Sequence, residues 1–126
     1  MTVSIFIVNT FTAEPFEGNP AAVCILPAPA SPGWMQQIAC EVNLPGTAFV
    51  DGEKNEFGLR CFTPFKELKT CAHATLAAAH VLWEQGMADA ESPLGFTHEN
   101  ARLSARLTMD WIELNAPAIK LEPGDL

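Results

Sequence analysis

Two side chains that can move protons, Cys71 and His73, lie two residues apart at the start of a helical pattern over residues 70–86. Thr70 can cap the helix, and Gly86 suits the left-handed position just past its end. The first turn of a helix presents free N–H groups and the positive end of the dipole. We therefore predict that this turn binds an anion such as a carboxylate. A helix N-terminus also favours the reactive thiolate form of a cysteine.

The helix that carries these side chains is rich in alanine, apolar on nearly every face and free of Lys and Arg. Such a helix is expected to be buried all round. His80, two turns after His73, is predicted to lie roughly on the same face. Both residues could instead have a purely structural role. His73 would then be a partly buried, hydrogen-bonded histidine, and Cys71 a buried, inert thiol.

The amino-acid composition and net charge exclude some classes of binding partner. The 126 residues carry a net charge of −8 without a Lys/Arg cluster, which argues against nucleic acid or an anionic membrane. No apolar stretch approaches the roughly 20 residues that span a bilayer. Cys24, Cys40 and Cys61 fall in apolar patterns, and no spacing predicts a metal site. Reduced cysteines indicate a cytoplasmic protein.

The remaining pattern predicts an α+β fold. A first helix is expected over residues 31–43, and strands at 3–11, 21–26, 47–50, 56–63, 94–97, 102–107 and 111–114. Both faces of the first strand are apolar, which predicts that both are covered. The architecture expected is a mixed, strongly curved sheet rolled around the central apolar helix, with the first helix outside. Residues 1–118 are expected to form one lobe, and residues 119–126 are expected to be a C-terminal tail or truncated interlobe linker.

A set of ordered motifs carries a family resemblance. They are Val8-Asn9-Thr10-Phe11, Gly18-Asn19-Pro20-Ala21-Ala22-Val23, Glu41-Val42-Asn43-Leu44, Thr47-Ala48-Phe49-Val50, Arg60-Cys61-Phe62-Thr63-Pro64, Glu67, Cys71-Ala72-His73-Ala74-Thr75-Leu76-Ala77 and Trp111-Ile112-Glu113-Leu114. Together they span essentially the whole chain. The chain resembles the N-terminal half of the phenazine-biosynthesis isomerase-like (PhzF-like) proteins, relatives of diaminopimelate epimerase.

The resemblance implies two similar lobes with an active site in the cleft between them. It implies cofactor-free proton transfer next to a carbonyl or carboxylate, on a small carboxylate-bearing molecule. The candidate catalytic residues are His73 and Cys71, and the candidate substrate-binding residues are Asn19, Ala72, His73 and Ala74.

The positions at which this sequence differs from the family pattern are those expected to take part in catalysis or ligand binding. Family members usually carry Asn-Leu-Ser-Glu-Thr after the first helix, and that glutamate is the general acid/base. Here the run is residues 43–47, with Gly46 at the glutamate position. Loss of a positioned acid/base typically lowers the rate by about 10²–10⁴-fold. Ala72 replaces a usual glycine, and Lys69 a usual acidic residue.

Three functions remain open from the sequence. In the first, two copies associate to replace the second lobe, and Cys71 or His73 transfers the proton, with Glu41 and Glu67 as the nearest spare carboxylates. In the second, the chain binds a ligand through Asn19 and His73 without chemistry. In the third, it is a structural or interaction domain. A lobe without its partner exposes an apolar face, which predicts a homodimer.

Overall fold

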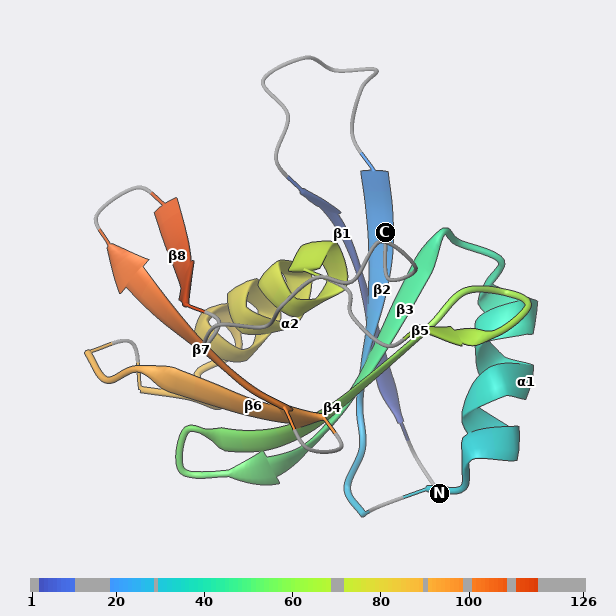
Figure 1. Ribbon diagram of the computed structural model, residues 1–126, viewed down its shortest axis with the longest axis horizontal. Helices are drawn as coiled ribbons and strands as arrows, with labels where there is room; N and C mark the ends of the chain where they lie inside the picture. Colours follow the sequence, from blue (N-terminus) through green and yellow to red (C-terminus); the bar gives the residue numbers. More distant parts are fainter. Residues whose placement is uncertain are drawn as a thin grey trace.

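The computed structural model describes residues 3–10, 19–28, 30–68, 72–89, 91–98, 101–108 and 111–115 (Figure 1). These residues form one mixed sheet and two helices. The elements are β1 (Ser4–Thr10), β2 (Asn19–Ile25), α1 (Pro32–Val42), β3 (Gly46–Glu53), β4 (Glu56–Phe62), β5 (Glu67–Leu68), α2 (Ala72–Glu84), β6 (Leu94–His98), β7 (Ala101–Thr108) and β8 (Trp111–Asn115). The α+β class and every helix and strand predicted from the sequence are confirmed.

The strand order is β1-β2-β3-β4-β6-β7-β8, and the short β5 pairs with β4 outside this path. The pairs β2–β3 and β4–β6 are parallel, and the others are antiparallel. The sequence prediction missed β5, because two residues in a polar link give no periodic pattern. The sheet is also not strongly curled, which corrects the expectation of a sheet rolled around the helix. The sheet would close into a barrel only if β1 paired with β8. In the described part of the chain these two strands do not pair and form the two edges of the sheet.

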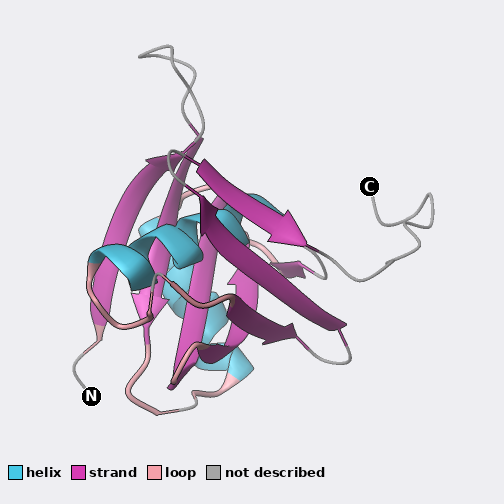
Figure 2. Ribbon diagram, turned by 90° about the vertical axis from the view of Figure 1, so that its left-hand side faces the viewer, coloured by secondary structure: helices cyan, strands magenta, loops and turns pink. Residues whose placement is uncertain are grey.

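The two helices cover opposite faces of the sheet (Figure 2). Helix α1 begins as expected: Ser31 Oγ accepts a hydrogen bond from the Trp34 N–H at 3.2 Å, and Pro32 occupies the first turn. It ends at Asn43, which adopts a left-handed conformation with φ of 55°. Its buried side packs into a cluster of Cys24, Leu26, Met35, Ala39, Phe49 and Phe62.

Helix α2 packs against β1, β2 and β3 and also contacts β8. Four of its alanines and Leu82 are buried in the larger core cluster: Ala74, Ala77, Ala78 and Ala79. Gly86 has the expected positive φ of 71°. However, the helix is not buried all round. The His80 side chain is 50% exposed and lies 2.7 Å, Nε2 to Oε2, from Glu84 one turn later. Histidine and glutamate therefore mark a face of α2 that the sheet does not cover.

Strand β1 is covered on one face only. Phe6 and Val8 pack against the larger core cluster, whereas Ile5 and Ile7 are 46% and 67% exposed. The prediction of two covered faces is therefore wrong. The reason is that α1 packs mainly on β3 and β4, whereas β1 lies at the edge of the sheet on the far side of β2.

The three cysteines in the described part of the chain differ in burial. Cys24 and Cys61 are buried as predicted, while Cys40 is exposed on α1, contrary to its expected core role. Burial raises the pKa of the Cys24 thiol to about 11. Within the described residues, neither helix has the length and apolar character needed to cross a membrane.

Candidate functional site

The candidate site is built where the start of β3 meets the first turn of α2. Strands β2 and β3 run parallel with Ala21 opposite Gly46, so both begin at the same end of the sheet. A methyl group added at Gly46 would lie 3.9 Å from Cβ of Ala74, and it would meet no other described atom within 4 Å. A side chain at position 46 would therefore start in ordinary van der Waals contact with the turn that the sequence predicts to bind an anion.

The structure places the predicted substrate-binding residues at this end of the sheet as far as it describes them. Asn19 is the first residue of β2, and Ala72, His73 and Ala74 are the first three residues of α2. Ala74 is 0% exposed as a whole residue, so neither its methyl group nor its backbone N–H faces solvent in this structure. The side chains of Asn19, Ala72 and His73, and the whole of Cys71, lie outside the described residues.

The two spare carboxylates suggested by the sequence, Glu67 and Glu41, lie in different surroundings. Glu67 accepts two hydrogen bonds from Arg60, at 2.7 Å from both Nε and Nη2, and this pair ties β5 to β4. Glu41 is exposed on α1, on the opposite face of the sheet from α2. Gly46 itself is buried and has no group to exchange a proton.

Thr47, which directly follows Gly46, was not singled out by the sequence analysis. The residue is fully buried, and its Oγ1 has no hydrogen-bond partner among the residues that the structure describes. Side chains alternate along a strand, so Thr47 shares the α1 face with Phe49 and points away from the side on which Gly46 meets Ala74. The apolar character of residues 47–50 could have predicted that Thr47 is buried. It could not have predicted that the Thr47 hydroxyl lacks a hydrogen-bond partner among the described residues.

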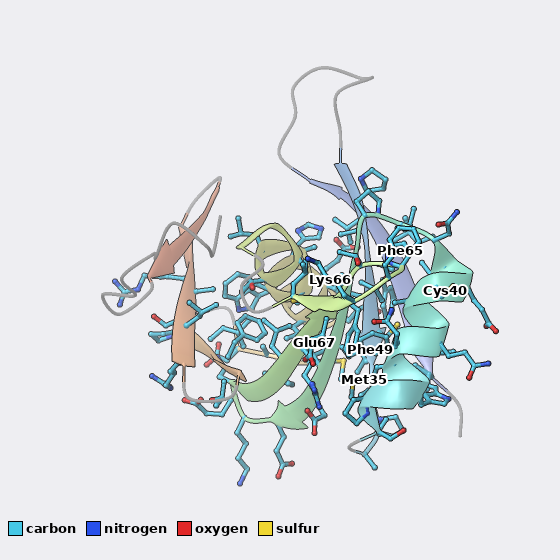
Figure 3. All side chains as sticks on the ribbon, turned by 45° about the vertical axis from the view of Figure 1, so that its right-hand side comes forward. Met35, Cys40, Phe49, Phe65, Lys66 and Glu67 are labelled. Atoms are coloured by element: carbon cyan, nitrogen blue, oxygen red, sulfur yellow. The ribbon has the colours of Figure 1, made fainter. Side chains whose placement is uncertain are left out.

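The loop between β4 and β5 lies beside the same end of the sheet, because Phe62 pairs with Thr47 in the register of β3 and β4. Thr63 Oγ1 accepts hydrogen bonds from the N–H groups of Phe65 and Lys66 at 3.1 and 3.0 Å. Gln36 on α1 donates to the Thr63 carbonyl at 3.0 Å. The loop is thereby fixed in a shape that presents two exposed side chains, Phe65 and Lys66 (Figure 3).

The fold and this meeting of β3 with α2 define a single lobe of the kind found in PhzF structures. Residues 8–122 match the family described as phenazine biosynthesis-like protein, PhzC-PhzF. The chain therefore belongs to the PhzC-PhzF family, which confirms the resemblance seen in the motifs.

Individual relatives agree with this assignment. An uncharacterized isomerase of Halalkalibacterium halodurans is 46% identical over 94% of this chain and 44% of its own length. The human phenazine biosynthesis-like domain-containing protein is 41% identical over 99% of this chain and 46% of its own. The crystal structure of an Enterococcus faecalis PhzF-family protein superposes with a TM-score of 0.80 at 40% identity, covering 89% of this chain and 43% of that one. The chain thus spans about half the length of the relatives it matches.

Proposed function

We propose that this isomerase-family lobe binds a small carboxylate-bearing molecule at the first turn of α2 and moves a proton on it without a cofactor. The observation that carries the proposal is the 3.9 Å approach between position 46 and Cβ of Ala74. It places the start of β3 against a helix N-terminus, where free N–H groups and the dipole favour carboxylate oxygens. Family membership and the relatives named as isomerases support the same chemistry.

In this proposal the proton-transfer group is His73 or Cys71, because position 46 carries no acid or base. His73 lies in the first turn of α2, and Cys71 immediately precedes the helix. A rate about 10²–10⁴-fold below that of a site with a positioned glutamate is the expected consequence.

A second candidate is a binding module that holds the same ligand without chemistry. Two observations favour it: Gly46 offers no proton, and Glu67 is held by Arg60 through two hydrogen bonds. The binding part of the proposal is common to both candidates, so it is the part to test first.

Binding is tested by titrating the purified chain with a panel of small amino and hydroxy acids, followed by NMR chemical shifts. We expect His73→Ala to weaken binding by at least about tenfold, the loss of one charge-assisted hydrogen bond, with the melting temperature unchanged. His80→Ala is the matched control, because His80 lies on the same helix and is exposed. If the wild type binds none of the panel, or if both variants weaken binding equally, the proposed site is wrong.

The role of position 46 is tested by Gly46→Glu with Gly46→Gln as a control of the same size. The contact with Ala74 leaves ordinary space for a Cβ. If the site retains its binding geometry, only the glutamate variant should gain proton exchange, by about 10²–10⁴-fold. Equal exchange by both variants would contradict an acid/base role for this position.

A further inference from the structure

The turn between β4 and β5 holds the backbone of Lys66 in a fixed position. Thr63 donates its N–H to the Lys66 carbonyl at 2.8 Å, and Thr63 Oγ1 accepts the Lys66 N–H at 3.0 Å. These bonds extend the ladder in which Phe62 opposes Glu67 by one further pair. The side chain of Lys66 is exposed. A positively charged group therefore projects from a well-defined backbone position.

The register also decides on which face of the sheet this side chain lies. Successive side chains of a strand alternate between the two faces, and opposed residues of neighbouring strands share a face. Phe62 packs in the cluster under α1, whereas Cys61 and the opposed Leu68 belong to the cluster under α2. Thr63 and Lys66, one residue beyond Phe62 in the ladder, therefore lie on the α2 face. In Figure 3, Lys66 likewise lies on the side of the loop that faces α2.

Lys66 falls in the same row of the sheet as Gly46. Thr47 opposes Phe62, so the antiparallel register sets Gly46 beside Thr63, and Thr63 is bonded to Lys66. Two strand spacings, about 10 Å, then separate the Cα atoms of positions 46 and 66. The row lies on the face where position 46 meets the first turn of α2. The flexible four-carbon stem of lysine can carry its ammonium group across this interval toward that turn.

The charge of Lys66 is available to a ligand. Within the described residues, Arg60 is paired with Glu67 and Arg102 with Glu56, and no ion pair joins Lys66 to a described carboxylate. The chain has a net charge of −8, so most of its surface repels a small anion. A lysine at this end of the sheet provides a local attraction for an anionic group, separate from that of the helix N-terminus.

We propose that Lys66 makes the candidate site selective for small dicarboxylates. The first turn of α2 holds one carboxylate, and the ammonium group of Lys66 binds the other. This inference rests on the proposed function, because it adds a second contact to the same ligand. Lysine is a point charge with rotatable donors, so the distance between the two carboxylates can vary among ligands.

Matched pairs of acids test this selectivity by NMR titration of the whole chain. Aspartate and malate are compared with alanine and lactate, which lack the second carboxylate. We expect the dicarboxylates to bind about three- to tenfold more tightly, between the gain of an exposed ion pair and that of a hydrogen-bonded charge. Lys66→Gln should remove this preference, with the affinity for alanine and lactate and the melting temperature unchanged. Lys66→Arg keeps the charge and should keep the preference.

The matched control is Lys54→Gln, which removes the same charge from an exposed lysine in the turn at the opposite end of β3 and β4. This variant should keep the preference for dicarboxylates. Equal loss in both glutamine variants would assign the effect to overall charge and overturn the inference. If the wild type binds both kinds of acid equally well, the selectivity of Lys66 is wrong while the proposed function stands. If it binds none of the four, the proposed function fails and this inference fails with it.

Discussion

Replacement of Thr47 by valine is predicted to stabilise the fold. Thr47 is fully buried, and within the described part of the chain its Oγ1 has no hydrogen-bond partner. A buried polar group without a partner costs about 1–3 kcal/mol of stability. Valine has nearly the same shape, suits a strand and puts a methyl group where the hydroxyl lies unsatisfied. The expected gain in unfolding free energy is therefore about 1–3 kcal/mol, or roughly 3–5 °C in melting temperature for each kcal/mol.

Urea denaturation followed by tryptophan fluorescence measures this change. The midpoint should rise while the slope with urea stays constant, since the surface exposed on unfolding is nearly unchanged. Thr75→Val is the matched control: Thr75 is equally buried but is not without an interaction partner. Its replacement should destabilise the protein by about 1–2 kcal/mol. If Thr47→Val also destabilises the protein, the hydroxyl of Thr47 has a partner and the reasoning fails.

Three further variants probe other parts of the structure. Asn55→Ala should destabilise the fold by about 1–3 kcal/mol in urea denaturation, because its amide donates to three carbonyls of the α2–β6 linker and accepts from one N–H; a change below half a kcal/mol would contradict this. Cys24, with its pKa raised to about 11, should stay protonated and unreactive toward maleimide at pH 8, while exposed Cys40 reacts. Since its folded pKa lies above the unfolded value of 9.0, stability should fall as pH rises from 9 toward 11 by up to about 2–3 kcal/mol, and Cys24→Ala should remove that slope. Glu67→Gln should lower stability by about 0.5–1.5 kcal/mol through its partly exposed pair with Arg60 and leave ligand binding unchanged, so a loss of binding would return Glu67 to the candidate site.

Local sequence signals predicted the ends of elements well. Ser31 and Pro32 begin α1, Asn43 ends it, and Gly86 follows α2 with the expected positive φ. These residues act through bonds and dihedral angles within a few positions of themselves, so the sequence contains the whole cause. The strands at 47–50 and 56–63 were likewise predicted, but β3 extends to Glu53, so the turn that joins it to β4 is only Lys54 and Asn55.

Coverage of apolar faces was harder to predict, because it depends on elements distant in sequence. The alternating pattern of β1 shows two apolar faces, but whether Ile7 is covered depends on where α1 packs. An apolar pattern likewise suggested burial for Cys40, which lies on the outer side of α1. The extent of curling could not be derived either, since it depends on whether the first and last strands meet.

The sequence predicted a candidate site at Gly46 and the first turn of α2, but not the surroundings of these residues. The structure brings Gly46 and Ala74 together, and the site itself stays a prediction. The structure also shows two facts that no motif indicates: Glu67 is hydrogen-bonded to Arg60, and Thr47 Oγ1 has no hydrogen-bond partner among the described residues. Both depend on the pairing of strands, and a single residue type gives no sign of them.

The account's central claim, proton transfer on a bound carboxylate, is tested most directly by deuterium incorporation from D₂O. The purified chain would be incubated with a panel of small amino and hydroxy acids, and exchange at the α-carbon followed by NMR. The account predicts slow incorporation in at least one compound, lost in His73→Ala or in Cys71→Ala and retained in His80→Ala. No incorporation with any compound by a folded protein that binds the panel would contradict catalysis and leave the binding module as its function.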